Sequence, residues 1–376
     1  MRITIVQGAF LPVPPLRGGA IEKAFHALAK EFAHAGHSVY YLSRECDNLP
    51  KEETEGQNIQ HLRIKGYDAP GSLIKLKWLD LLYSIRARRY LPDADILITH
   101  TFWMPILARN PRHGSLYIHV GRSPKGQMRL YKHAARFQTV SSAIGDAIQN
   151  ELPLKKKSNV KVLPYPLDSA FLTFSNTTSE KKKRILYAGR IHPEKGLELL
   201  LKGFSELAKP LRQQWELKII GPWRKEEGGA GKKFLDSLKA SAIGLNVHFQ
   251  EPIFDQESLV REYDEASLFA YPSLAEQGET FGLAALEAMS RGCLTVVSNL
   301  QCFKDFVEDG VNAFCFEHRK ANPEQDLGAK LVNLIQNHKQ LQPVRQEAIR
   351  VAQAHSPKSI SEKFIDDFRS IHKLSP

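Results

Sequence analysis

The segment from Glu279 to Ser298 combines two glutamates, a stretch of small residues and an apolar run, and it constrains the fold more than any other part of the chain. Glu279 and Glu287 stand eight positions apart, so helical periodicity puts them near one face, about two turns apart. Gly292 predicts the end of this helix, and residues 293–298 predict a buried strand. Free N–H groups of the loop before the helix favour anions. The segment therefore predicts a loop–helix–strand unit of an α/β fold with an anion site at the loop.

A unit of strand, helix and strand opens the chain. Residues 2–6 predict a buried strand, residues 17–36 a helix with apolar residues at helical spacing, and residues 38–42 the next strand. This order is typical of a parallel sheet. Gly18 and Gly19 stand at the start of the helix, where glycines let backbone N–H groups approach a phosphate closely.

A second series begins after the polar, turn-rich stretch 175–183, which predicts a domain boundary. Residues 184–188 predict a strand, residues 197–208 a helix and residues 216–220 another strand. Later strands are expected at 246–249 and 268–271. The chain of 376 residues is long enough for two such domains.

Positive charge is concentrated in the first half of the chain. Residues 1–170 hold 24 Lys and Arg against 14 Asp and Glu, whereas the remainder is nearly balanced. This asymmetry indicates either an anionic partner for the first half or a surface that serves solubility. No apolar run approaches the roughly 20 residues of a membrane helix, and the short apolar run at the start does not predict a secretory signal. The four cysteines lack metal-site spacing, so we expect reduced thiols in a cytoplasmic protein.

Two motifs carry a resemblance to a known family. The segment Glu279–Glu287, with Phe281-Gly282 inside it, resembles the Glu-x7-Glu signature of the family 4 glycosyltransferases. The segment Gly189–Gly196, which contains Arg190 and Lys195, resembles the same family's Gly-Arg…Glu-Lys-Gly segment. The resemblance is specific over most of the second domain and looser over the first.

The resemblance implies the GT-B fold, in which two doubly wound Rossmann-like α/β domains face each other across a cleft. Residues 1–170 would bind the acceptor, and a C-terminal helix at 360–376 would cross back to complete this domain. Residues 171–359 would bind the nucleotide-sugar. The implied activity is a retaining transfer of a hexosyl group from a nucleotide-sugar, a UDP-sugar in the first instance, to a glycan or lipid-linked acceptor in cell-envelope or exopolysaccharide synthesis.

The resemblance also implies roles for individual residues. Arg190 and Lys195 would stabilise the leaving diphosphate, and Glu287 would accept the ribose hydroxyls. Glu279 would hold the donor sugar, helped by backbone N–H groups. The implied catalytic residues are His119, Arg190, Lys195 and Glu279. The implied donor-binding residues are Gly18, Gly19, Arg190, Lys195, Ile253, Glu279, Phe281, Gly282, Leu283 and Glu287.

The chain contains no Asp-x-Asp metal motif, so protein cations would replace a metal, and no cofactor beyond the nucleotide-sugar is expected. No carboxylate is placed as a covalent nucleophile, which favours a front-face displacement. Three alternatives stay open: a sugar-nucleotide epimerase of the same fold, extension of a soluble glucan, and a non-enzymatic anion-binding protein. Nucleic acid is not an expected partner.

Residues 71–91 combine apolar, basic and aromatic side chains, as a membrane-surface helix does. A helix packed on the sheet through Leu79, Leu82 and Ile85 has the same composition, and both interpretations can hold together. A further basic group, Arg122–Arg136, follows His119 and would lie at the mouth of the same cleft. The residues expected to meet an acceptor or the inner face of an anionic membrane are Trp78, Arg122, Lys125 and Arg129.

Three stretches depart from the family pattern. Tyr165 and Pro166 stand where the family has Asn-Gly, which predicts a stiffer hinge and the loss of the asparagine's contacts. Trp223 and the glycine-rich insert 228–231 follow the strand at 216–220, where the family often has Gly-x-Gly. Trp223 and the insert put the base and ribose contacts in doubt, but not the diphosphate site.

Overall fold

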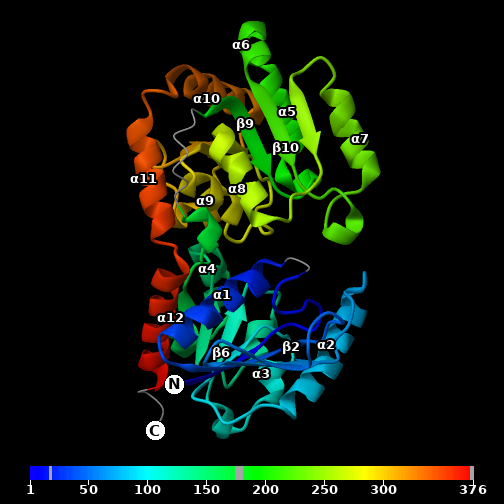
Figure 1. Cartoon of the computed structure of the whole chain (residues 1–376), viewed down its shortest axis with the longest axis vertical. Coiled ribbons are helices and arrows are strands. Elements are labelled where there is room, and N and C mark those ends of the chain that lie inside the picture. Colours follow the sequence, from blue (N-terminus) through cyan, green and yellow to red (C-terminus); the bar gives the residue numbers. More distant parts are fainter. Residues whose placement is uncertain (17–18, 174–180, 373–376) are drawn as a thin grey trace. The chain divides into compact units, whose positions relative to one another are not determined.

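The computed structural model describes residues 1–16, 19–173 and 181–372 and divides into two compact units (Figure 1). The first unit is Met1–Asp168 with Pro357–Pro376, and the second is Ser169–Ser356. Each unit is a largely parallel sheet covered by helices on both faces, which confirms the prediction of two doubly wound Rossmann-like domains. Gly18 lies outside the described residues.

The first unit has an eight-stranded sheet in the order β3-β4-β2-β1-β5-β6-β7-β8, with only the β3–β4 pair antiparallel. Helix α1 lies on one face with α12, and helices α2, α3 and α4 pack their apolar side chains on the other. The strands are β1 (Arg2–Val6), β2 (Ser38–Arg44), β3 (Glu52–Glu55), β4 (Ile59–Ile64), β5 (Ile96–Thr99), β6 (Ser115–Val120), β7 (Arg136–Thr139) and β8 (Val160–Val162). The helices are α1 (Ala20–His34), α2 (Leu73–Arg88), α3 (Met104–Leu107), α4 (Ser142–Glu151) and α12 (Pro357–His372).

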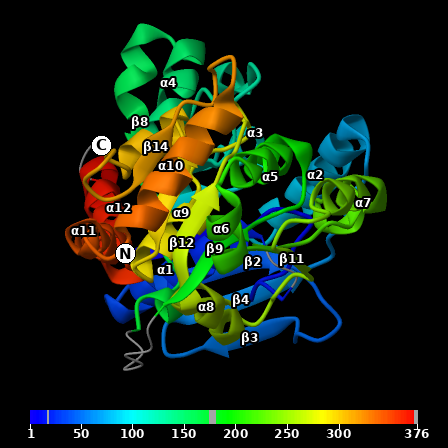
Figure 2. The same ribbon diagram turned by 90° about the horizontal axis from the view of Figure 1, so that it is seen from above.

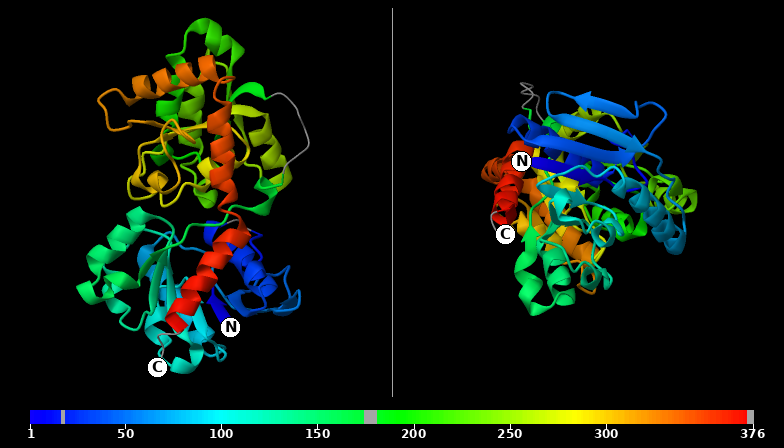
Figure 3. Two further views of the ribbon diagram at one scale, coloured as in Figure 1. Left: turned by 90° about the vertical axis from the view of Figure 1, so that its left-hand side faces the viewer. Right: turned by 90° about the horizontal axis from the view of Figure 1, so that it is seen from below.

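The C-terminal helix α12 packs against α1 (Figure 3). The ring of Phe368 lies 5.5 Å from the ring of Phe32, so aromatic side chains fill the space between the two helices. The carboxylate of Asp367 accepts a hydrogen bond from the Tyr117 hydroxyl at 2.9 Å and pairs with Arg136 at 2.8 Å. These contacts are buried, and they make the last helix a part of the first unit.

The pairing with Asp367 corrects one prediction. Arg136 begins β7 opposite Tyr117, two positions before His119 on the neighbouring parallel strand β6, and its guanidinium is engaged by Asp367. The expectation that Arg136 joins a basic group beside His119 is therefore wrong. Its guanidinium instead neutralises the buried carboxylate of Asp367 on α12.

Helix α2 forms within the predicted range but packs through a different face. Tyr83 and Ala87 are fully buried, Leu79 and Leu82 are half-buried and Ile85 is exposed, so the predicted packing through Ile85 is wrong. The buried carboxylate of Asp80 explains the rotation, because it accepts hydrogen bonds from the backbone N–H groups of Phe102 and Trp103 at 3.0 and 3.2 Å. Satisfying these N–H groups turns a polar residue inward and leaves apolar residues outside.

The second unit has a six-stranded parallel sheet in the order β11-β10-β9-β12-β13-β14 (Figure 2). Helices α5, α7 and α10 pack together on one face, and α8 and α9 cover the other, where α11 packs on α9. The strands are β9 (Lys182–Ala188), β10 (Glu216–Ile220), β11 (Val247–Gln250), β12 (Ala266–Tyr271), β13 (Leu294–Ser298) and β14 (Phe314–Phe316). The helices are α5 (Leu197–Ser205), α6 (Lys209–Gln214), α7 (Lys232–Ser241), α8 (Gln256–Glu265), α9 (Leu283–Ser290), α10 (Pro323–Asn337) and α11 (Gln342–Gln353).

Candidate functional site

The motif residues of the second unit gather at the carboxyl ends of its strands. Strands β9 and β12 are hydrogen-bonded neighbours, and each is followed by a loop that leads into a helix. The loop after β9 carries Arg190 and Lys195, and the loop after β12 carries Glu279. In doubly wound sheets this edge is where ligands bind. The sequence motifs, although far apart in the chain, therefore meet at one edge.

The two loops are fixed to each other by backbone contacts. The N–H of Leu274 donates to the carbonyl oxygen of Glu194 at 2.8 Å. Gly196 has a φ of 69°, and a Cβ at this position would lie 2.0 Å from the carbonyl oxygen of Pro272. Only glycine permits both this backbone conformation and this close approach. The adjacent Lys195 is thereby held against the second loop.

Lys195 and Glu279 form a buried ion pair. The Lys195 Nζ lies 2.7 Å from Oε2 of Glu279, and the two side chains are only 7% and 9% exposed. The Lys195 ammonium also lies 5.4 Å from the centroid of the Tyr271 ring. The two loops thus hold a cation and an anion together, an arrangement that suits a site for a phosphate and the hydroxyls of a sugar.

Arg190 is exposed and is oriented by two hydrogen bonds. Its Nη1 donates to the carbonyl oxygen of Gly228 at 2.9 Å, and its Nη2 donates to Glu194 at 2.8 Å. Gly228 belongs to the glycine-rich insert that departs from the family pattern. The insert therefore positions a candidate phosphate-binding arginine, a role that the sequence did not predict.

Helix α9 begins where the sequence predicts and carries the second glutamate. Gly282 precedes it with a φ of 89°, and a Cβ there would lie 2.2 Å from the ring of Phe303. Leu283 is the first helical residue, so its N–H is among the free donors of the helix start. Glu287 is half-buried, and its Oε2 accepts a hydrogen bond from the Tyr263 hydroxyl at 3.0 Å. The tyrosine orients the carboxylate expected to bind a ribose.

Aromatic residues beneath the loops were missed in the sequence. Tyr187 of β9 and Tyr271 of β12 stack with ring centroids 5.8 Å apart, and the Tyr187 hydroxyl donates to the carbonyl oxygen of Arg190 at 2.9 Å. Both tyrosines are at most 5% exposed, so they form a rigid base for the Arg190 loop. In the sequence, these two tyrosines lie near the carboxyl ends of predicted strands. The same pattern is equally typical of ordinary core residues.

Phe281, Ile253 and Trp223 lie on three loops around this edge. Phe281 is buried and packs on the ring of Phe306, with centroids 5.2 Å apart, so only its backbone can serve a ligand. Ile253 is half-buried in the segment after β11. Trp223 follows β10, and its indole N–H donates to Glu251 at 2.9 Å.

In the first unit, His119 lies near the carboxyl end of β6 and is almost fully buried. Gln138 uses its side-chain N–H groups on two backbone carbonyls, so its Oε1 accepts from Nδ1–H of His119 at 2.6 Å. The Nε2 atom then accepts from the Tyr165 hydroxyl at 3.1 Å. Burial lowers the pKa of His119 to about 4, so the ring is neutral at pH 7. A residue that departs from the family pattern therefore engages this histidine.

A buried carboxyl, Glu22, lies at the start of α1 and was not identified from the sequence. Its Oε1 accepts from the Gln7 side chain at 3.0 Å, and burial raises its pKa. Gly19 is adjacent, because a Cβ there would lie 2.1 Å from Oε2 of Glu22. The signal was a glutamate in the first helical turn after Gly-Gly, a position where acidic residues are ordinary.

The basic residues after β6 are exposed. Arg122 and Lys125 lie in the loop that follows the strand, and Arg129 donates from Nε to the carbonyl oxygen of Glu151 at 3.2 Å. Trp78 on α2 is 59% exposed, next to Leu73 at 72% and Ile74 at 84%. An apolar, basic surface is thus present on α2. Within the described part of the chain, no helix has the length and apolarity that crossing a membrane requires.

One trio of possible metal ligands occurs among the described residues, in the first unit. Atoms of His26, Glu55 and His61 lie within 4.8 Å of one another. The Nε2 atoms of the two histidines lie 2.8 and 2.9 Å from Oε2 of Glu55, and Lys30 lies 3.0 Å from Oε1. Hydrogen bonds and this ammonium account for the trio without a metal. The expectation of a metal-independent reaction stays a prediction.

The sequence matches two known protein families, and these matches assign the chain to a family. The chain matches the family described as glycosyl transferases group 1 over residues 168–351, and glycosyltransferase family 4 over residues 18–171. The protein belongs to the group 1 and family 4 glycosyltransferases. The predicted resemblance is therefore confirmed, and the glycosyltransferase matches cover both units.

Individual relatives agree with this assignment. This glycosyltransferase is 34% identical to lipopolysaccharide 1,2-N-acetylglucosaminetransferase of Salmonella typhimurium over 137 residues, which are 35% of this chain and 34% of that protein. It is 23% identical to spore coat protein SA of Bacillus subtilis over 350 residues, which are 86% and 88% of the two chains.

Solved structures share the fold. Sucrose-phosphate synthase from Thermosynechococcus elongatus matches with a TM-score of 0.79 at 16% identity over the whole of both chains. Anabaena HepE in complex with UDP and glucose matches with a TM-score of 0.69 at 16% identity, covering 98% of this chain and 99% of that one. These similarities establish the GT-B fold of this glycosyltransferase.

Proposed function

We propose that this glycosyltransferase moves a sugar from a nucleotide-sugar to a glycan or lipid-linked acceptor, with retention of the anomeric configuration. The observation that carries the proposal is the buried Lys195–Glu279 pair beside Arg190, at the carboxyl edge of a doubly wound sheet. The leaving nucleoside diphosphate gains negative charge as the sugar departs. Two cations held at this edge would stabilise that charge without a metal.

The two glutamates would divide the recognition of the donor. Glu287, which Tyr263 orients, would accept the vicinal hydroxyls of the ribose. Glu279 would accept hydroxyls of the transferred sugar when Lys195 turns from the carboxylate to the diphosphate. Backbone N–H groups at the start of α9 would supply further hydrogen bonds. A donor phosphate oxygen would take the proton of the acceptor hydroxyl in a front-face displacement.

The proposed donor is a UDP-sugar, and the proposed product is a cell-envelope polysaccharide. Support for UDP comes from Anabaena HepE, whose solved structures contain UDP and UDP-glucose. Support for the product comes from the partial match to a lipopolysaccharide N-acetylglucosaminetransferase. The surplus of positive charge in residues 1–170 and the exposed Trp78 surface favour an acceptor on an anionic membrane face.

The test is a screen with UDP-, GDP- and ADP-sugars, measuring release of the nucleoside diphosphate. We expect release with one class of donor, faster when an acceptor glycan is present, and an NMR spectrum of the product that shows the donor's anomeric configuration. Lys195→Ala serves as the inactive control. Conversion of the donor into an isomeric nucleotide-sugar without transfer would instead identify an epimerase, and binding of anions without any turnover would identify a non-enzymatic protein.

A further inference from the structure

A cationic cavity lies in the second unit, at the end of its sheet opposite the candidate site. Its volume is about 390 Å³, within the range of small-molecule sites. Lys181 precedes β9, and Gly292 precedes β13, so the cavity lies at the amino ends of the strands. Among the described residues that line it, Lys181, Arg291, Lys339 and Arg345 are cations and none is acidic.

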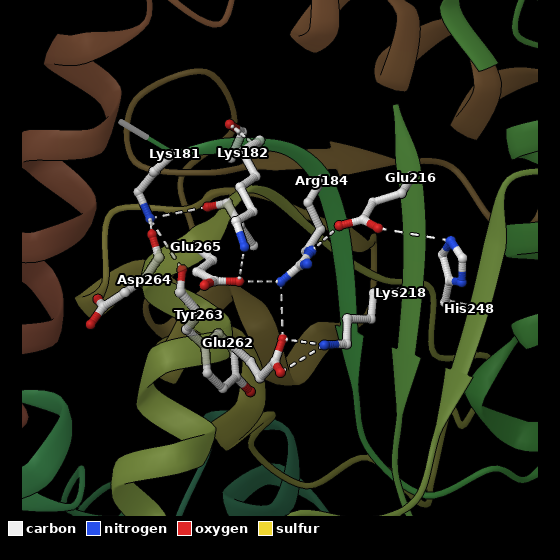
Figure 4. A network of polar contacts seen from close by, with 12 residues as sticks. Lys181, Lys182, Arg184, Glu216, Lys218, His248, Glu262, Tyr263, Asp264 and Glu265 are labelled. Carbon is white, nitrogen blue, oxygen red and sulfur yellow. Dashed lines mark hydrogen bonds and ion pairs between the residues drawn. The ribbon is translucent and has the colours of Figure 1, made fainter. Parts of the chain in front are cut away.

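Two of these cations have structural partners. The Lys181 ammonium donates to the carbonyl oxygens of Tyr263, Asp264 and Ala266 at 3.0 to 3.1 Å, at the end of helix α8 (Figure 4). Arg291 donates to both carboxylate oxygens of Asp264 at 2.7 and 3.0 Å. Asp264 is thus the nearby acid, and it already neutralises one cation. The described residues that line the cavity therefore carry a net positive charge.

Arg345 has no such partner. It is only 7% exposed, and its Nη1 donates to the carbonyl oxygen of Gly292. Its buried Nε has no hydrogen-bond partner, and within the described ranges no carboxylate forms an ion pair with its guanidinium. Burying an unpaired charge costs free energy, because water that solvated the charge is lost. Burial lowers the pKa of Lys181, and the nearby Arg345 and Arg291 act in the same direction.

Helix α11 adds to the attraction for anions. It begins at Gln342, and three of its first five residues, Gln342, Arg345 and Gln346, line the cavity. Pro343 has no N–H group, but the N–H groups of Gln342 and Val344 lack partners within the helix, and the helix dipole is positive at this end. A guanidinium with unused donors, two amides and a helix start therefore converge on one cavity.

We propose that this cavity binds a small phosphate-bearing dianion, either inorganic phosphate or a phosphomonoester, at a second site separate from the donor site. The guanidinium of Arg345 offers a donor fork that fits phosphate oxygens, and Lys339 adds a charge at the exposed rim. The donor loops follow the strands at their other ends, so both sites can be occupied at once. The proposal is independent of the transferase reaction.

The first experiment is calorimetric titration of the full chain with inorganic phosphate and with glycerol phosphate in a phosphate-free buffer. We expect Arg345→Gln to raise the dissociation constant about tenfold or more, since a charged hydrogen-bond partner is lost. Lys339→Gln should raise it by about twofold to fivefold, because its charge is exposed. Arg350→Gln is the matched control, as Arg350 lies on the same helix, pairs with Glu347 and does not line the cavity. Stronger binding of the ester than of phosphate would identify an organic phosphate as the ligand.

Two further measurements make the result decisive. Arg190→Gln should leave phosphate binding in the cavity intact, so loss of binding in this variant, with Arg345→Gln unchanged, would overturn the proposal. Arg345→Gln should unfold at the same temperature as the wild type or higher without phosphate, because it removes a buried unpaired charge.

Discussion

Lys195 Nζ lies 2.7 Å from Oε2 of Glu279, although the two residues are 84 positions apart in the chain. The pair is buried, so neither charge is solvated by water and each depends on the other. A nucleotide-sugar would offer both groups new partners, a diphosphate for the ammonium and sugar hydroxyls for the carboxylate. The ion pair therefore holds both charged groups in place, and in the proposed mechanism the donor would replace this contact.

Replacing Lys195 by Ala should lower kcat by about two to three orders of magnitude, the scale for removing a preorganised electrostatic stabiliser. Steady-state kinetics with saturating donor measures this. Lys202→Ala on the exposed side of α5 is the control and should retain full activity. Turnover of Lys195→Ala within threefold of the wild type would remove this residue from the mechanism.

Replacing Arg190 by Ala should lower kcat by a similar factor of about 100 to 1,000. The two variants should differ in stability. Arg190 is exposed, so its loss should hardly change the unfolding temperature, whereas Lys195→Ala leaves the buried carboxylate of Glu279 without its partner. Thermal unfolding of both variants tests this difference, and the double variant Lys195→Ala/Glu279→Ala should recover stability but not activity.

The two glutamates should respond differently to substitution. Glu287→Ala should chiefly raise the dissociation constant of the donor, because its hydroxyl contacts exist in the ground state and in the transition state alike. Glu279→Ala should reduce kcat more than donor affinity. Tyr263→Phe removes the hydroxyl that orients Glu287 and should give a weaker version of the first effect. Equal loss of kcat in both glutamate variants, with donor binding unchanged, would contradict the division.

Local signals in the sequence predicted the parts of the fold that depend on neighbouring residues. Glycines at 282 and 292 mark the start and end of α9 because both adopt positive φ. Apolar strand runs predicted both sheets. The Lys195–Glu279 distance could not be predicted in this way, because it depends on β9 and β12 being neighbours and on the close contact of Gly196 with Pro272.

The wrong predictions arose where a polar contact decided the packing. On α2, apolar residues suggested the buried face, but Asp80 turns inward to bind two backbone N–H groups of another segment. Likewise, Arg136 seemed part of a basic group until Asp367, far along the chain, paired with it. Periodicity reports apolar burial and carries no information on such partners. The hydrogen bond from Arg190 to the carbonyl oxygen of Gly228 could not be predicted for the same reason.

Activity should survive EDTA, since Arg190 and Lys195 take the place of a metal in the proposed mechanism. Initial rates of nucleoside diphosphate release, measured with and without the chelator, test this expectation. His61→Ala is a useful companion variant, because it breaks the one trio of possible metal ligands found in the described residues. Complete loss of activity in EDTA that magnesium restores would overturn the metal-free scheme.

His119 should make stability depend on pH. Its pKa is about 4 in the folded protein against an ordinary value of 6.5, so below pH 6.5 the unfolded chain binds a proton that the folded one does not. Stability therefore falls as the pH drops from 6.5 to about 4, and by about 2 kcal/mol at pH 5 from this residue. Urea unfolding at pH 7 and pH 5 should show a smaller difference in His119→Gln than in the wild type. His34→Gln, which changes an exposed histidine, should behave as the wild type does.

Membrane association should depend on the apolar surface of α2 and on salt. Leu73, Ile74 and Trp78 are all more than half exposed, and cations flank them on the same helix. Each basic residue near an anionic bilayer contributes on the order of 1 kcal/mol, and this attraction weakens as salt shortens the Debye length to about 8 Å at physiological strength. Sedimentation with anionic liposomes should show binding at low salt that decreases at high salt.

The variant Ile74→Ser/Trp78→Ala separates the apolar contribution from the electrostatic one. It should bind liposomes less at every salt concentration, because the apolar contribution does not depend on ionic strength, while the remaining binding keeps its salt dependence. Phe254→Ser is the matched control, since it removes a 73% exposed aromatic residue from the second unit. If the wild type ignores anionic vesicles at low salt, the surface of α2 does not meet a membrane. A soluble glycan or a small-molecule acceptor then becomes the better interpretation.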